Sequence, residues 1–133
     1  MNILKELKRE IEQCENVDST DVSSQNRISI LKSILKIKTD NEKGLAYKKM
    51  LYLLLVKICI VLIELQNEEV VTFDLEDLDL IANKIGNPNT SVEDLLNVIE
   101  YLLEDRFSDV YTILTLRDEL IRLIYERLIL EKA

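Results

Sequence analysis

The stretch Leu45–Leu65, LAYKKMLYLLLVKICIVLIEL, decides the fold, because a helix this apolar must bury most of its surface. After Lys49 it carries only two charged residues, Lys57 and Glu64. At about 100° per residue, one sector about 100° wide collects the polar positions and two apolar ones: Lys49, Lys57, Glu64, Glu68, Leu53 and Ile60. The rest of the circumference is apolar. We therefore predict that residues 45–65 form the central buried helix of a bundle.

A membrane span is the alternative interpretation of this stretch. Its uninterrupted apolar runs, Met50–Val56 and Ile58–Ile63, are well short of the about 20 residues that cross a bilayer. Lys57 would also lie near the middle of the bilayer, where a charge is costly. We therefore expect a soluble core helix and no membrane partner.

Composition favours a single helical domain. The chain has 133 residues, of which 47% are hydrophobic and 32% are charged, and it contains 2 Gly and 1 Pro. So few helix breakers favour helices throughout. We expect an all-α bundle of five to six helices in one domain, residues 1–133. The N-terminal helix, residues 1–16, is expected to be loosely attached through a polar linker, residues 17–26.

The N-terminal residues show no secretory pattern, because Met1–Cys14 is charged throughout and lacks an apolar core segment. We therefore expect a cytoplasmic protein. Cys14 and Cys59 both lie on predicted apolar helix faces. In that compartment we expect them to be buried thiols and not a disulfide.

Capping signals set the helix boundaries in the first half of the chain. Ser23 or Ser24 is expected to cap a helix over Arg27–Lys38. Thr39 and Glu42 match a capping box, which predicts that the central helix runs from about residue 40 to about residue 67. The following β-rich residues, 68–73, are predicted to form a loop or one edge strand.

In the second half, Asp74 is expected to cap a helix that ends at Ile85, and Gly86 is expected to stop it in a left-handed conformation. Thr90 and Glu93 match a second capping box, which opens a helix to about Asp105. A long helix is predicted within residues 108–132. Residues 107–115 are rich in β-branched side chains, and a small β wing is the alternative there.

Residues 71–96 resemble a helix-turn-helix, with Ala82 allowing close approach and Gly86 at the turn. Downstream, YTILTLRDEL is similar to the strand-into-helix segment that follows many wings, so the resemblance covers about residues 70–120. Asn87 stands where such motifs usually place an apolar residue. The resemblance implies a winged-helix-like nucleic-acid-binding regulator whose second helix, within residues 74–104, reads the major groove.

The charge of that second helix opposes DNA binding. Residues 86–105 contain no Lys or Arg, and their acids are Glu93, Asp94, Glu100, Glu104 and Asp105. Phosphate attraction supplies most non-specific affinity for DNA. We therefore treat nucleic acid as an alternative partner and favour two core helices joined by a tight turn.

The residues required for most catalytic and metal sites are missing. The chain has no His and only 2 Cys, which removes His-based acid–base catalysis and the usual zinc sites. With 2 Gly, it cannot build a phosphate-binding loop. Asp74–Asp79, DLEDLD, lacks the Gly that a calcium loop has at its sixth position. We expect no enzyme activity, no cofactor and no metal.

Charge is unevenly distributed along the chain and defines two candidate surfaces. Residues 1–63 hold 11 Lys and Arg against 8 Asp and Glu, whereas residues 64–133 hold 6 against 17. A partner-binding acidic ridge is expected at Glu93, Asn97, Glu100 and Glu104. A basic surface for an anion or nucleic acid is expected at Arg27, Lys32, Lys36, Lys38, Lys43, Lys48 and Lys49.

The chain also carries more apolar helix surface than a bundle of this size can hide, which favours a homodimer or a groove for a partner helix. We expect a non-enzymatic protein–protein interaction module or helical adaptor that associates with itself. The alternatives are the helix-turn-helix regulator and a small helical subunit of a ribonucleoprotein complex.

Overall fold

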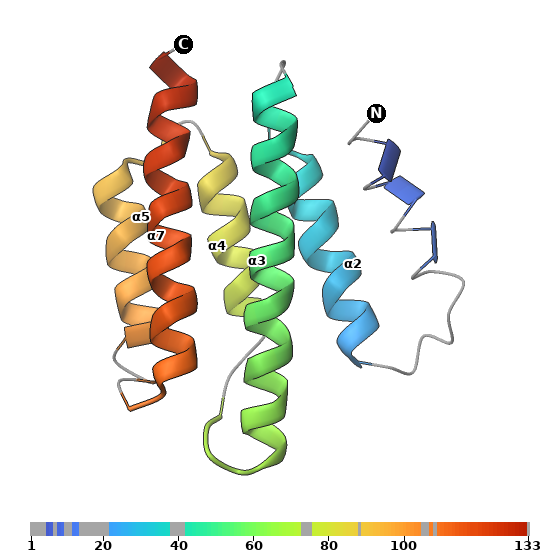
Figure 1. Ribbon diagram of the computed structural model, residues 1–133, viewed down its shortest axis with the longest axis vertical. Helices are drawn as coiled ribbons and strands as arrows, with labels where there is room; N and C mark the ends of the chain where they lie inside the picture. The colour runs from blue at the N-terminus through green and yellow to red at the C-terminus, as the bar shows by residue number, and fades with distance from the viewer. Residues whose placement is uncertain are drawn as a thin grey trace.

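The computed structural model describes residues 5–6, 8–9, 12–13, 22–37, 42–72, 76–87, 89–104, 107 and 109–132. Over these residues the protein is all-α, as the sequence predicts, and contains no strand. Figure 1 shows the elements, which are α2 (Val22–Leu35), α3 (Glu42–Asn67), α4 (Glu76–Gly86), α5 (Val92–Ile99), the π-helical turn η1 (Glu100–Glu104) and α7 (Tyr111–Lys132). Residues 5–6, 8–9 and 12–13 are helical as well.

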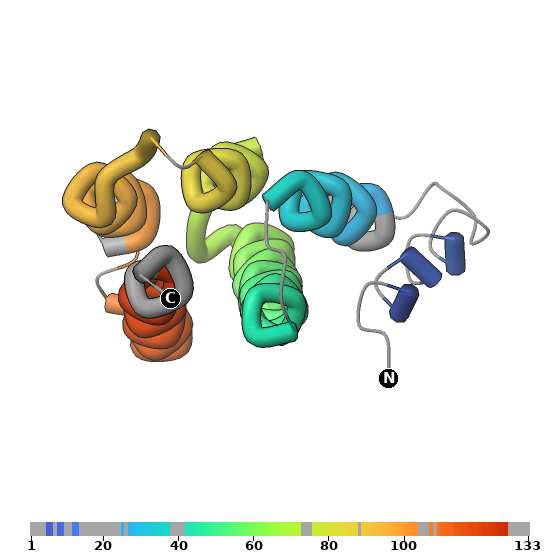
Figure 2. Tube along the Cα trace, turned by 90° about the horizontal axis from the view of Figure 1, so that it is seen from above, coloured from blue at the N-terminus to red at the C-terminus, as the bar shows by residue number. Residues whose placement is uncertain are grey.

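The helices form two layers, which Figure 2 shows end-on: α2, α4 and α5 lie in one layer, and α3 and α7 lie in the other. In Figure 1, α3 and α7 run in opposite directions side by side. Each therefore has one face against the first layer and one face turned away from it. This second, outward face becomes important for the site.

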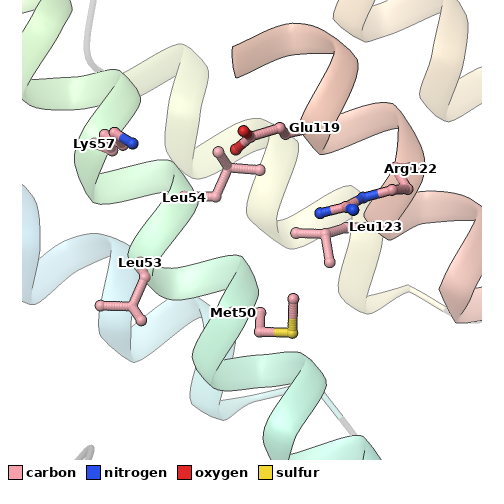
Figure 3. Close-up of a pocket in the computed structure, with 7 residues that line it drawn as sticks. All are labelled: Met50, Leu53, Leu54, Lys57, Glu119, Arg122 and Leu123. Atoms are coloured by element: carbon pink, nitrogen blue, oxygen red, sulfur yellow. The ribbon is translucent and has the colours of Figure 1, made fainter. Parts of the chain in front are cut away.

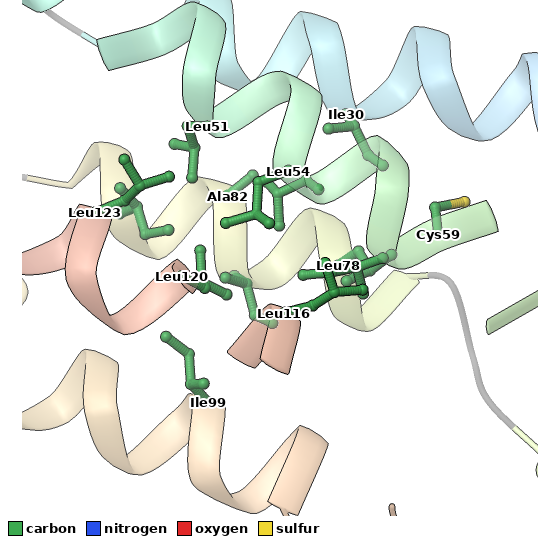
Figure 4. Close-up of a cluster of buried hydrophobic side chains, with 14 of the residues drawn as sticks. Ile30, Leu51, Leu54, Cys59, Leu78, Ala82, Ile99, Leu116, Leu120 and Leu123 are labelled. Carbon is green, nitrogen blue, oxygen red and sulfur yellow. The ribbon is translucent and has the colours of Figure 1, made fainter. Parts of the chain in front are cut away.

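The core is built around α3, which confirms the predicted central helix. Leu51, Leu55, Ile58 and Leu62 of α3 are each 0% exposed. Figure 4 shows leucines of α3, α4 and α7 gathered with Ala82 in one buried cluster. The predicted outward sector of the helix is also confirmed, because Leu53, Lys57 and Glu64 are exposed.

Among the described helices, α3 is long and apolar enough to cross a membrane by length and composition. The core helix of a soluble protein meets the same criterion, and four residues of α3 are completely covered by protein.

In the first half of the chain, α2 begins earlier than predicted. Residues 22–26, which the sequence assigned to a linker, form its first turns, and Ser23 and Ser24 lie inside the helix and do not precede it. Ser and Asn favour linkers and helix starts alike, so composition does not separate the two. At the other end, the amides of Lys36 and Ile37 bond to carbonyls three residues back, which closes α2 at Leu35. The capping box at Thr39 lies outside the described residues, as does the cap at Asp74.

Among the described residues, the left-handed conformation is adopted by Glu69, with φ 61°, and not by Gly86, whose φ is not positive. After α3, the amide of Glu69 donates to the carbonyl of Gln66 at 3.0 Å, and the amide of Val70 donates to that of Leu65 at 3.0 Å. These two bonds form a Schellman motif with Glu69 at its left-handed position. Residues 68–72 are therefore a turn and not a strand.

Gly86 ends α4 for a different reason. A Cβ added there would lie 2.9 Å from Cγ1 of Ile37, so the glycine allows α4 to approach the residues that follow α2. The next helix starts one residue later than predicted, because the N-cap is Ser91, whose Oγ accepts from the amide of Asp94 at 3.1 Å. Through η1 the helical segment reaches Glu104, close to the predicted end at Asp105.

The alternative of a β wing at residues 107–115 is wrong for the residues described there. Residues 109–110 form a turn, and α7 begins at Tyr111. Thr115, one of the residues that suggested a strand, bonds through Oγ1 to the carbonyl of Tyr111 at 3.0 Å. Ile113 is 0% exposed, so burial against the core overrides its β propensity.

Candidate functional site

The acidic ridge is exposed as far as the structure describes it. Glu93, Asn97 and Glu100 all have exposed side chains, and the side chain of Glu104 lies outside the described part of the chain. The π-helical turn begins at Glu100, so the register of the ridge changes there. Among the described residues, no groove or apolar patch accompanies these carboxylates. The ridge as a partner-binding site therefore stays a prediction.

The residues of the predicted basic surface differ in their exposure. Lys32, Lys36 and Lys43 are exposed, Arg27 and Lys49 are half-buried, Lys48 is buried, and Lys38 lies outside the described residues. Lys48, only 5% exposed, donates from Nζ to the carbonyl of Leu35 at 3.4 Å. It therefore caps the C-terminal end of α2, where a positive charge is favourable. Lys48 cannot belong to an anion-binding surface in this fold.

Lys49 already has a carboxylate partner. Its Nζ lies 2.7 Å from Oε2 of Glu6, and this hydrogen bond and the charge of Lys49 lower the pKa of Glu6. The pair joins α3 to the N-terminal helical residues. A nucleic-acid phosphate would have to compete with this carboxylate, which leaves Lys32, Lys36 and Lys43 as the exposed cations of the predicted surface.

The α4–α5 connection, which resembles a helix-turn-helix, is tied to α7 by a buried arginine. Arg127 is 8% exposed, and its Nη2 donates to the carbonyl of Asn87 at 2.7 Å. The side chain of Asn87 accepts from the amide of Asn89 at 2.9 Å, which shapes the turn. The polar Asn87 is thus part of the turn itself. Sequence reasoning missed Arg127, because a charged residue near the end of a long amphipathic helix usually faces solvent.

A hydrogen bond between side chains joins α2 to α4, close to Cys59 of α3. Ser29 donates from Oγ to Oδ2 of Asp79 at 2.5 Å. Nearby, burial raises the pKa of the Cys59 thiol to about 11; the charge of Arg27 acts to lower this pKa, and that of Asp79 acts to raise it. A thiol that stays protonated is a poor nucleophile and a poor metal ligand. Among the described residues, no group of three or more His, Cys, Asp or Glu could hold a metal ion.

The most distinctive surface lies on the outward side of α3 and α7. An open groove of about 250 Å³ runs between the two helices and is shown in Figure 3. It is lined by Met50, Leu53, Leu54 and Lys57 of α3 and by Glu119, Arg122 and Leu123 of α7. Met50 is 44% exposed and Leu53 is 51% exposed, although both belong to the helix that forms the core.

Charged side chains border this apolar groove without neutralising one another. Within the described chain, no ion pair joins Glu119 to Lys57 or to Arg122, although all three line the same groove. Tyr125, one turn after Arg122 on α7, is 51% exposed. We call the following residues the α3–α7 face: Lys43, Met50, Leu53, Lys57, Glu64, Glu119, Arg122 and Tyr125.

Sequence reasoning placed Leu53 in the polar sector of the central helix but did not identify a site there. The signal was an apolar residue among lysines and glutamates on the outward side. It could not be interpreted without knowing that α7, about 65 residues later, completes the groove.

Comparison of this chain with protein-family models, with curated proteins and with solved structures finds no match. The site is therefore interpreted from its own geometry.

Proposed function

We propose that this protein is a non-enzymatic protein–protein interaction module whose docking surface is the α3–α7 face. The observation that carries the proposal is the exposure of Met50 and Leu53 beside a groove with unpaired charges at its border. Exposed apolar side chains scattered singly on a surface need no explanation, whereas apolar side chains gathered at a groove often mark an interaction site.

The face has the anatomy of a protein interface. Its centre is apolar, at Met50, Leu53 and Leu54, and its border is charged, at Lys57, Glu119 and Arg122. An apolar centre that excludes water, surrounded by a polar rim, is the usual arrangement in protein complexes. The groove volume of about 250 Å³ is below the about 300–1,000 Å³ of pockets that enclose small molecules. It suits one or two side chains of a protein partner.

The nucleic-acid alternatives gain less support from the same residues. Of the predicted basic surface, Lys48 is buried and Lys49 is paired with Glu6. The helix that would read DNA, α5, exposes Glu93, Asp94 and Asn97. A reading helix without cations lacks the phosphate contacts that hold its register on DNA.

The test is photo-crosslinking in the cell that makes the protein, with p-benzoyl-phenylalanine in place of Leu53. The matched control carries the same group in place of Leu80, which is 45% exposed on α4, in the other layer of the fold. We expect crosslinks to discrete proteins from position 53 and none from position 80, and competition by excess unlabelled protein should remove them. Equal or absent protein crosslinks at both positions would refute the proposal, and crosslinks to RNA or DNA would favour the ribonucleoprotein or regulator alternative.

A further inference from the structure

We propose that the occupant of the α3–α7 face is a second copy of this chain, docked so that α3 lies antiparallel to α3 of its partner around a two-fold axis. This inference rests on the proposed function and names the partner. It is carried by the distribution of charge along the face, which is complementary to itself when one copy is reversed.

The seam of α3 on this face changes sign along its length. Lys43, Met50, Lys57 and Glu64 recur every seven residues, so they line one side of the helix. All four are exposed. The seam therefore begins with the cation Lys43 and ends with the anion Glu64, and between them lie apolar Met50, neighbouring Leu53 and the cation Lys57. Reversing one copy places cation against anion at both ends.

The groove fixes where the axis must pass. Its residues on α3 run from Met50 to Lys57, and its residues on α7 run from Glu119 to Leu123. An axis in the plane of the interface, crossing both helices at the middle of the groove, lies next to Leu53. That axis places Lys43 opposite the partner's Glu64 and Glu119 opposite the partner's Arg122. One position of the axis therefore pairs opposite charges on α3 and on α7.

This arrangement pairs four of the five charged residues of the α3–α7 face, namely Lys43, Glu64, Glu119 and Arg122. In a two-fold interface every contact occurs twice, so each of these charge pairs is formed twice. Leu53 of the two copies would meet near the axis, where burial contributes most. Met50 would pack against the aliphatic part of the partner's Lys57, because a lysine covers apolar surface with its methylenes.

The size of the face is adequate for a stable dimer. Lys43 and Glu64 are about 32 Å apart along the helix, from a rise of about 1.5 Å per residue. Two helices packed about 8–10 Å apart cover a width of about 20 Å. The product of length and width, about 640 Å², treats the face as flat, and protruding side chains add to it. This area approaches the about 800 Å² per partner of a standard interface.

The first experiment is sedimentation equilibrium of the full-length protein, with the variants Leu53→Asp and Leu80→Asp. We expect the wild type to be a dimer with a dissociation constant of about 10 µM or tighter. Leu53→Asp should weaken the dimer at least about 100-fold, and the control Leu80→Asp should leave it unchanged. Circular dichroism checks that each variant is folded. A wild type that is monomeric at about 1 mM would overturn the inference, and so would equal effects of the two variants.

The second experiment tests the antiparallel arrangement by charge reversal. Lys43→Glu and Glu64→Lys alone should each weaken the dimer about 10-fold, because each creates two like-charge contacts. The double variant Lys43→Glu/Glu64→Lys should return to within about 3-fold of the wild type. Lys36→Glu, an exposed reversal directly after α2, controls for the change in net charge and should have no effect. A double variant that is weaker than both singles would overturn the antiparallel geometry.

The outcomes separate this inference from the proposed function. Crosslinks from position 53 to a different protein, with a monomeric wild type, would leave the interaction module standing and remove the second copy as its partner. The absence of any crosslink from position 53 would remove both.

Discussion

Gly86 provides a test of how the α4–α5 connection is built. Replacing it with Ala adds a Cβ that would lie 2.9 Å from Cγ1 of Ile37, closer than carbon atoms approach one another. Ile37 is 7% exposed, and its Cγ1 is not the free end of a flexible side chain, so the contact is hard to relieve. Overpacking of this kind costs about 1–3 kcal/mol.

Two effects of Gly86→Ala oppose each other. Ala favours a helix over Gly by up to about 1 kcal/mol, and less at the last residue of α4. Overpacking therefore wins, and we expect a net loss of about 1 kcal/mol in the free energy of unfolding. Ile37→Ala alone should cost about 2–4 kcal/mol, because it opens a cavity.

The double variant Gly86→Ala/Ile37→Ala separates the cost of the contact with Ile37 from the effect of Ala on the helix backbone. In the Ile37→Ala background Cγ1 is absent, so Gly86→Ala should be neutral or stabilising by up to about 1 kcal/mol. The assay is urea unfolding followed by circular dichroism, in which an unchanged urea dependence shows that the unfolded states are comparable. If Gly86→Ala costs the same in the wild type and in the Ile37→Ala variant, the contact with Ile37 is not the cause of the loss. The requirement for glycine would then lie in the backbone conformation.

Substitutions at Glu69, Arg127 and Cys59 report on other parts of the structure. Glu69→Gly relieves a left-handed residue and should raise the free energy of unfolding by about 0.5–1 kcal/mol in urea unfolding; a loss of stability would contradict the Schellman motif after α3. Arg127→Met removes the bond to the carbonyl of Asn87 and should cost about 2 kcal/mol, whereas Arg127→Lys, which keeps a donor and the charge, should cost less; an Arg127→Met variant as stable as the wild type would contradict a stabilising role of this bond. In a Cys14→Ser variant, Ellman's reagent at pH 8 should modify Cys59 only as fast as the protein opens, and rapid modification of the folded protein would show that the thiol is accessible. Because the pKa of Cys59 is raised to about 11, the unfolded thiol ionises first, so its contribution to stability should fall from about pH 8.5 up to pH 11, and Cys59→Ala should reduce that loss.

The apolar pattern was sufficient to predict the central helix and its outward sector. In the run from Leu45 to Leu65 the exposed residues are Met50, Leu53, Lys57 and Glu64, and the fully buried residues lie on the other side of the helix. Helical periodicity alone carries this information, because burial in α3 follows the angle of each residue around the helix axis.

Local signals were less reliable where one residue type serves two purposes. A glycine at a helix end indicates a left-handed turn or a close approach, and at Gly86 only the position of Ile37, far away in the sequence, decides between them. Glu69 carries no sequence signal for the left-handed conformation that it adopts. Likewise, the β-branched residues near Ile113 favour a strand by propensity, but they form the start of α7, where Ile113 is buried.

The basic surface stays a prediction, but periodicity already argues against including both Lys48 and Lys49 in it. Lys48 and Lys49 are adjacent, so on a helix they point about 100° apart, and one of them can face a neighbouring helix while the other faces outward. The structure places Lys48 over the end of α2 and pairs Lys49 with Glu6. The α3–α7 face, in contrast, depends on the packing of two helices that are distant in sequence, and no local pattern contains it.

The central claim, that the α3–α7 face docks against a second copy, is tested most directly by methyl NMR of Met50. The chain contains 2 Met, so labelling with methyl-¹³C methionine gives one signal at the groove, which Met50→Leu assigns. We predict that this signal shifts or broadens as unlabelled protein is added from about 1 µM to about 1 mM, while the Leu80 methyl signals of leucine-labelled protein do not. A Met50 signal that stays unchanged over that range, or that changes together with those of Leu80, would contradict the claim.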